Sequence, residues 1–209
     1  MDPSASWEHV KADIFWGEVA DCKHIVQIYE TDEVFIDALA GFTMSGFEIE
    51  DCCIIIATQA HLKLLNDRLA SAGWQIDELI AAGKYMPHVA DDLLSKCIKN
   101  GHYDESLFLL TASGVMTQAR NTKRVIRMFG ETSGLLFARG YHDAAFAMEH
   151  MANKFCVDEA ICLFCAYSKE SFEKEKQASL DHICAEHSKM ISGSAKQLTD
   201  IYYRDIATV

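Results

Sequence analysis

Short apolar runs alternate with amphipathic segments along most of the chain. The runs cover residues 24–29, 52–57, 85–89, 125–129 and 160–167. Most of them do not alternate between apolar and polar residues, which is typical of strands that are covered on both faces. Strands that alternate with helices favour a parallel sheet joined by right-handed crossovers. We therefore predict an α/β fold with a mostly parallel sheet of about five or more strands and helices on both faces.

The segments between these runs have helical spacing and helical stop signals. The predicted helices cover residues 33–45, 60–72, 76–82, 91–99, 105–119, 133–139 and 143–155. Four of them end just before a glycine, at Gly46, Gly73, Gly83 and Gly140, which is the expected helix stop.

The pattern changes after Tyr167. Residues 173–191 are charged and amphipathic, and they predict a C-terminal helix followed by a tail. Such a stripe either docks on its own domain or forms a helical homodimer. We divide the chain into an N-terminal extension (1–21), an α/β domain (22–169) and a C-terminal helix with its tail (170–209).

Composition excludes several classes of protein. The net charge of −12 argues against a direct nucleic-acid surface and against binding to anionic membranes. No apolar run approaches the ~18 residues of a membrane span, and the N-terminus has no features of a secretion signal. We therefore expect a cytoplasmic protein. The eight cysteines lie within apolar strands and helices, where reduced, buried thiols are usual.

The turn after the first apolar run contains no glycine. A nucleotide-binding α/β protein would bind its phosphate there. Glycines would let the backbone N–H groups approach the phosphate closely, and a lysine would neutralise its negative charge. This chain has Tyr29, Glu30, Asp32 and Glu33 instead. The turn therefore favours a sensor or binding domain, without a functional phosphate loop, over an NTPase.

Ligands of open parallel sheets bind outside the carboxyl ends of the strands. Glu30 and Glu131 each follow an apolar run directly. Two carboxylates there could orient a polar ligand, hold a cation or act as acid and base, or they could cap helix N-termini. His24 stands at the opposite end of its strand, where a structural role is the commoner one.

Two pairs of residues have the spacing of a zinc site. They are Cys162 with Cys165, and Cys184 with His187. However, positions three apart in a strand point to opposite faces, so the two cysteines of the first pair cannot easily converge on one ion. We therefore predict no metal site.

The order of several short segments resembles the MEDS family, the methanogen/methylotroph sensory domain named for the DcmR regulator. The matching segments are 24–30 with Asp32 and Phe35, 54–58 with His61, 83–86, 127–131, 135–136, 144–149 with Asn153, 163–167, Phe172, and 183–188. The resemblance covers about residues 22 to 194.

The resemblance implies a RecA/KaiC-like fold that senses small molecules, hydrocarbon derivatives among them, without catalysis and without a cofactor. Such domains usually precede histidine kinases or DNA-binding regions, so the implied partner is a kinase or a transcription regulator. Carried onto this chain, the family's pattern points to His24, Tyr29, Glu30, Gly130, Glu131, Cys165, Tyr167 and His187 as ligand-binding residues.

Two other functions stay open at this point. One is a degenerate RecA-like protein that still binds a nucleotide with Mg²⁺ through Glu30 and Glu131. The other is a structural module that dimerises through residues 173–191.

Overall fold

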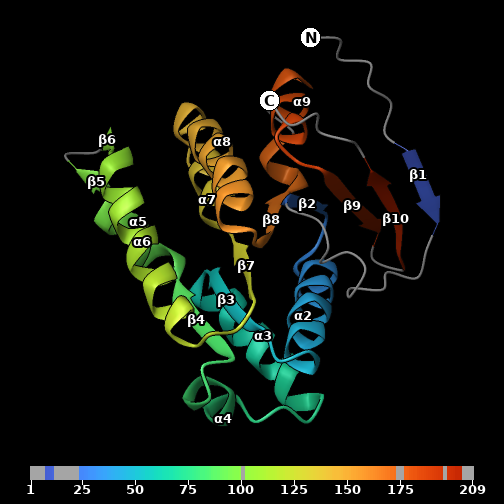
Figure 1. Ribbon diagram of the computed structural model, residues 1–209. Helices are drawn as coiled ribbons and strands as arrows, with labels where there is room; N and C mark the ends of the chain where they lie inside the picture. Colours follow the sequence, from blue (N-terminus) through green and yellow to red (C-terminus); the bar gives the residue numbers. More distant parts are fainter. Residues whose placement is uncertain (1–7, 12–23, 100–101, 173–176, 195–196, 204–209) are drawn as a thin grey trace.

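The computed structural model describes residues 8–11, 24–99, 102–172, 177–194 and 197–203. Its centre is an eight-stranded sheet with the order β1-β10-β9-β2-β8-β7-β3-β4 (Figure 1). The strands are β1 (Glu8–Lys11), β2 (His24–Tyr29), β3 (Cys52–Ala57), β4 (Tyr85–Val89), β7 (Ile126–Gly130), β8 (Cys162–Ser168), β9 (Lys189–Ser194) and β10 (Gln197–Tyr203). The strands from β9 to β4 are parallel, whereas β10 and β1 pair antiparallel. The predicted α/β fold with a mostly parallel sheet is confirmed.

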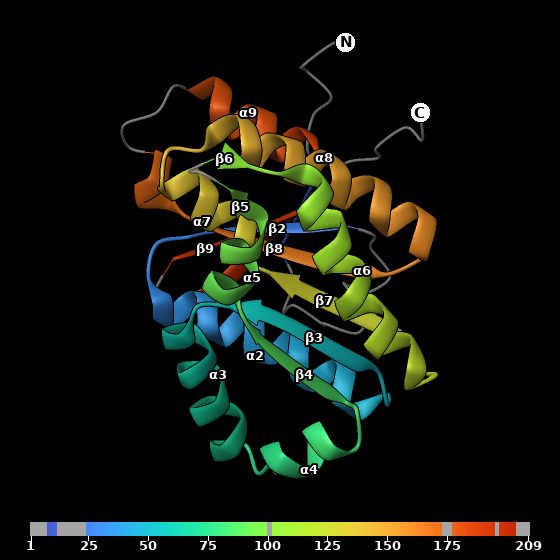
Figure 2. The same ribbon diagram turned by 90° about the vertical axis from the view of Figure 1, so that its left-hand side faces the viewer.

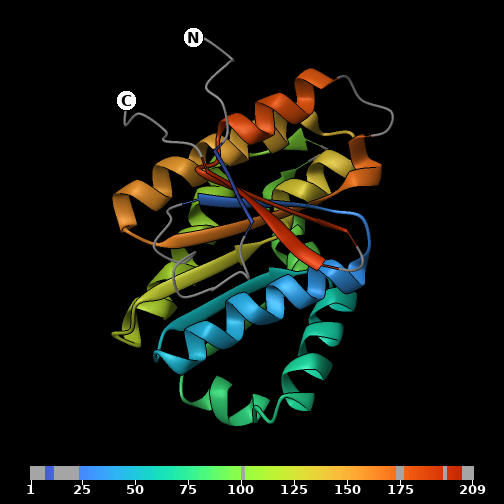
Figure 3. The same cartoon turned by 90° about the vertical axis from the view of Figure 1, so that its right-hand side faces the viewer.

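Helices cover both faces of this sheet. One face carries α2 (Asp32–Glu48), α3 (Gln59–Ser71) and α4 (Ile76–Ala81), and Figure 3 shows α2 lying across it. The other carries α5 (Ala90–Cys97), α6 (Glu105–Asn121), α7 (Thr132–Ala138), α8 (His142–Glu159) and α9 (Gln177–Ala185), several of which stand in front of the strands in Figure 2. The short elements β5 (Ile98–Lys99), β6 (His102–Tyr103) and η1 (Lys169–Phe172) complete the described chain.

Each covered face has its own apolar core, and β2 contributes to both. Ile25 packs with the α2 and α3 layer, whereas Val26 packs with the layer of α5 to α9. Because side chains alternate along a strand, His24 points to the same layer as Val26. The first residue of β2 is therefore a fully buried histidine beneath α8.

The C-terminal region differs from the prediction of one helix over residues 173–191. Helix α9 ends at Ala185, and residues 189–194 form β9, which pairs with β2. Ser188 starts this pairing, since its backbone N–H and its hydroxyl both donate to the His24 carbonyl, at 2.9 and 2.7 Å. The helical prediction is wrong here because the free edge of the buried strand β2 needs backbone partners, and this pairing overrides local propensity.

The structure also describes parts of the predicted N-terminal extension (1–21) and of the predicted C-terminal helix and tail (170–209). The described part of the predicted N-terminal extension, β1, pairs with β10, which lies in the predicted tail. Residues 173–176 of the predicted helix lie outside the described residues. The described part of the stripe docks on its own domain, because Ile183 is fully buried in the core beside α8. The boundary at residue 170 stays a prediction.

Candidate functional site

Glu131 anchors a group of polar side chains at the carboxyl edge of the sheet. One of its carboxylate oxygens accepts a hydrogen bond from the Thr58 N–H at 2.9 Å, and the other lies 2.8 Å from His61 Nδ1. His61 Nε2 in turn lies 3.6 Å from a carboxylate oxygen of Asp32. Glu131 therefore holds the start of α3, where the helix dipole favours a negative charge, rather than its own helix α7.

Charge shapes the ionisation of this edge cluster, which we define as Tyr29, Asp32, His61 and Glu131. Burial lowers the pKa of His61, but Glu131 and Asp32 together raise it above its ordinary value. Burial, with the charges of Glu131 and Asp32, raises the pKa of Tyr29, whose ring stacks on Phe35 at 4.7 Å. The cluster is thus a protonated histidine between two carboxylates at mildly acidic pH.

The two glutamates that the sequence placed at this edge have different partners. Glu30 pairs with Lys169 at 2.6 Å, and both side chains are exposed. Glu131 is buried and contacts His61. The expectation that these carboxylates act together therefore gains no support from their described contacts.

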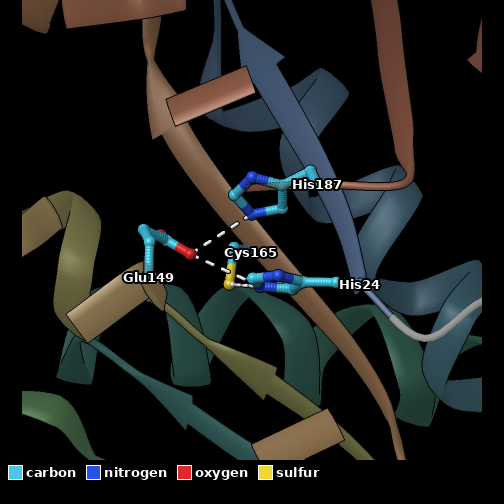
Figure 4. Close-up of side chains that lie close together, drawn as sticks. All are labelled: His24, Glu149, Cys165 and His187. Carbon is cyan, nitrogen blue, oxygen red and sulfur yellow. Dashed lines mark hydrogen bonds and ion pairs between the residues drawn. The ribbon is translucent and has the colours of Figure 1, made fainter. Parts of the chain in front are cut away.

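A second polar group lies in the interior, between the sheet and α8. We call it the buried tetrad: His24 from β2, Glu149 from α8, Cys165 from β8 and His187 from the segment that joins α9 to β9 (Figure 4). One potential metal-ligand atom from each residue lies within 4.8 Å of those of the other three. None of the four is more than 3% exposed, so bulk solvent does not reach them.

The two histidines point the same ring nitrogen at Glu149. His24 Nε2 lies 3.4 Å and His187 Nε2 lies 3.3 Å from Glu149 Oε2. His24 Nε2 is also 3.4 Å from the sulfur of Cys165. Their Nδ1 atoms face backbone carbonyls instead, that of Glu186 at 3.1 Å and that of Ile183 at 2.7 Å.

These contacts fix where the hydrogens lie. A carbonyl can only accept, so each Nδ1 carries the hydrogen, and a neutral ring then has a lone pair on Nε2. Among the described residues, Glu149 Oε2 and His187 Nε2 have no partner with hydrogen-bond geometry. At the centre of the tetrad the two Nε2 atoms therefore converge on Glu149 Oε2, and they present lone pairs to it whenever the rings are neutral.

Burial and charge act on the tetrad in opposite ways. Burial, then the neighbouring His187, lower the pKa of His24. Burial raises the pKa of Glu149, but His187 and His24 overcome it and hold this pKa well below its usual range. Tyr167 donates its hydroxyl to Glu149 Oε1, and burial with this carboxylate raises the pKa of Tyr167 far above normal. The same two causes raise the pKa of Cys165. The ionised form of Glu149 is thus the favoured one.

The two sequence pairs with zinc spacing separate in space. Cys162 belongs to the core on the α2 side of the sheet, and Cys165 to the core on the α8 side, as the strand period predicts. The sulfur of Cys184 lies 3.8 Å from that of Met190 and is not in the tetrad. One member of each pair therefore joins the tetrad, with His24 and Glu149 from elsewhere.

A cavity of about 360 Å³ lies beside the tetrad, between β3, β7 and β8 and the helices α5 to α8. Most of its lining is apolar, and Glu149, Cys165 and Ser133 are polar members of its wall. Of the residues predicted to bind ligand, Gly130 and Cys165 line it, whereas Tyr29, Glu30 and Glu131 do not. The cavity therefore lies between the sheet and the helices α5 to α8, and not in the predicted crevice beyond the carboxyl ends of the strands.

The profile of the MEDS family, described as the methanogen/methylotroph, DcmR sensory domain, matches residues 23–188. The chain belongs to the MEDS family. The match begins one residue before His24 and ends one residue after His187, so it includes the whole buried tetrad. The family is described as sensory, and this coarse role applies to the chain.

Among solved structures, a protein from Pyrococcus horikoshii OT3 is similar to this MEDS protein. The two share 10% sequence identity at a TM-score of 0.55, over 93% of this chain and 94% of the other. At this identity the similarity concerns the fold alone. The closer likeness to RecA and KaiC stays a prediction. No curated protein sequence matches the chain.

Sequence reasoning found three members of the tetrad and missed the fourth. Glu149 lies on α8 beside Ala145 and Met148, both buried in the core. A single carboxylate on the apolar face of a helix was the signal that could have found it.

Of the described helices, none is long and apolar enough to cross a membrane.

Proposed function

We propose that this MEDS domain is a non-catalytic signal-input domain that binds a small, largely apolar organic molecule in the cavity beside the buried tetrad. The cavity carries this proposal. Its volume of about 360 Å³ is within the usual range of small-molecule sites, and its wall is mostly apolar with a few polar side chains that can orient a ligand.

A route from the cavity to the C-terminal elements supports a signalling role. Glu149 and Cys165 line the cavity and also contact the histidines of the tetrad. His187 lies two residues before the start of β9, and its neighbour Ser188 donates its hydroxyl to the His24 carbonyl. A ligand that shifts Glu149 would therefore favour one packing of α9 and β9 over another. The receiver of this signal would be a histidine kinase or a transcription regulator.

Ligand binding is tested with a pair of glycine variants. A Cβ added at Gly130 or at Gly114 meets no atom within 4 Å, but only Gly130 lines the cavity. Small halogenated and aliphatic molecules are screened for a rise in melting temperature, which binding to the folded state produces. We expect Gly130→Val to abolish the rise and Gly114→Val to retain it. A rise that survives in both variants would exclude this cavity as the site.

A separate experiment tests whether the protein binds a nucleotide. The turn after β2 carries Glu30, Asp32 and Glu33, which oppose the approach of a phosphate. We expect no change in melting temperature with ATP and Mg²⁺ at millimolar concentration. A saturable change, lost on charge reversal of Glu131, would favour the degenerate nucleotide-binding protein instead.

A further inference from the structure

We propose that the buried tetrad binds one divalent transition-metal ion, of which Zn²⁺ is the best fit. His24, Glu149, Cys165 and His187 are its ligands. This site goes beyond the binding of an organic molecule in the cavity and does not depend on it.

The donor set has the chemistry of such an ion. Two imidazoles, one thiolate and one carboxylate match the ligands that Zn²⁺ takes in proteins, whereas Mg²⁺ and Ca²⁺ prefer oxygen alone. The argument against a Cys162–Cys165 pair still holds, because those side chains belong to different cores. The set forms instead from four separate segments of the chain.

The distances fit a tetrahedral shell. Metal–nitrogen and metal–oxygen bonds of about 2.0 Å at the tetrahedral angle place neighbouring donors about 3.3 Å apart, and a sulfur donor about 3.6 Å from a nitrogen. The two histidines lie 3.4 and 3.3 Å from Glu149 Oε2, and His24 lies 3.4 Å from the Cys165 sulfur. The remaining donor pairs, all within 4.8 Å, close around an ion by small side-chain adjustments.

A bound cation would also give partners to the polar atoms at the centre of the tetrad. Both Nδ1 atoms donate to backbone carbonyls, so each ring, when neutral, turns the lone pair of its Nε2 toward Glu149. Glu149 Oε2 and His187 Nε2 have no hydrogen-bond partner among the described residues, although both are fully buried. A metal ion accepts all of these lone pairs at once. On binding, Cys165 becomes a thiolate and its proton passes to solvent.

The surroundings of the tetrad resemble the outer shell of a metal site. Ligating histidines generally donate their second N–H to a carbonyl or carboxylate, which fixes the ring, and both histidines do so here. Tyr167 donates to the second oxygen of Glu149 and so holds the carboxylate in place. An ion bound there would link β2, α8, β8 and the start of β9.

The test begins with the full chain, purified without chelators, and its metal content by mass spectrometry. Metal-free protein is then titrated with Co²⁺, because a cobalt–thiolate bond has its own charge-transfer absorption. We expect about one ion per chain and a thiolate band. Cys165→Ala should lose the band, whereas Cys162→Ala, on the same strand but the opposite face, should keep it.

A conservative outer-shell variant keeps the test independent of folding. Tyr167→Phe retains the ring and removes only the hydroxyl that holds Glu149, so we expect Co²⁺ to bind about 10–100-fold more weakly. Wild-type protein without stoichiometric metal and without Co²⁺ binding would overturn the proposal, as would a thiolate band that persists in Cys165→Ala. Either result would leave the organic-ligand proposal intact, since the glycine variants test that one alone.

Discussion

The edge cluster and the buried tetrad each join a glutamate to histidine, but they satisfy their charges differently. At the edge, Glu131 accepts hydrogen bonds from a backbone N–H and from His61, and Asp32 adds a second negative charge. In the tetrad, the Nε2 atoms of two histidines lie 3.4 and 3.3 Å from Glu149 Oε2, and all three side chains are fully buried. At the edge both ring nitrogens of His61 face carboxylate oxygens, whereas in the tetrad Glu149 Oε2 and His187 Nε2 have no hydrogen-bond partner among the described residues.

This difference separates a structural role from a binding role. A carboxylate at a helix N-terminus with a histidine beside it is a stabilising arrangement that needs no ligand. Buried polar atoms without a hydrogen-bond partner, such as Glu149 Oε2 and His187 Nε2, are rare in native proteins and call for a specific explanation. The tetrad is therefore the better candidate for function, and variants at matched positions in the two clusters test that ranking.

We expect the largest difference in unfolding free energy between alanine variants of Glu149 and Glu131. Removing one partner of a buried ionic group costs about 3–5 kcal/mol, so we expect Glu149→Ala to lower the free energy of unfolding by that amount. Glu131→Ala loses hydrogen bonds at the partly solvated edge, which costs about 1–3 kcal/mol. Urea denaturation measures both. An equal or smaller effect at Glu149 would contradict the contrast.

The two tyrosines give a smaller and more conservative comparison. Tyr167→Phe removes a hydroxyl that donates to a buried carboxylate, and we expect a loss of about 1.5–3 kcal/mol in unfolding free energy. Tyr29 stacks on Phe35, and none of the described hydrogen bonds involves its hydroxyl. Tyr29→Phe should therefore change stability by no more than about 0.5 kcal/mol. A larger effect at Tyr29 would reverse the ranking of the two clusters.

The edge cluster should impose a pH dependence through His61. Its pKa is raised above the ordinary 6.5, so its charge contributes stability that is fully present below pH 6.5 and lost as pH rises through the raised value. We expect His61→Gln to cost about 1–2 kcal/mol near pH 5.5 and less near pH 9. Asp32→Asn leaves His61 in place but removes one of the charges that raise its pKa. The pH above which His61 stops contributing stability should therefore be lower in this variant. A cost that is independent of pH would show that the charge of His61 contributes nothing.

The exposed ion pair between Glu30 and Lys169 should have the smallest effect. Such pairs are screened by water and salt, so Glu30→Ala should change the free energy of unfolding by less than about 0.5 kcal/mol. Thermal denaturation at low and high salt measures it. A loss as large as that of Glu131→Ala would mean that the predicted pair of edge glutamates acts together after all.

Local pattern was sufficient for most of the fold. The mostly unalternating apolar runs identify β2, β3, β7 and β8, because strands buried on both faces are predominantly apolar, and a weaker run identifies the edge strand β4. The helices between them follow from spacing and from glycine stops. The pattern was not sufficient for β9, because Met190 and Ile191 fit a helix stripe as well as a strand, and only the open edge of β2 decides between them.

The sequence by itself determined the α/β class, the family, the missing phosphate loop and three of the four tetrad residues. It could not determine that these residues meet, because His24 and His187 lie 163 positions apart and join only when β9 pairs with β2. Nor could it select Glu149, whose significance arises from the two histidines and the tyrosine around it. Only the tertiary structure decided this, since convergence of donors is a property of packing and not of spacing along the chain.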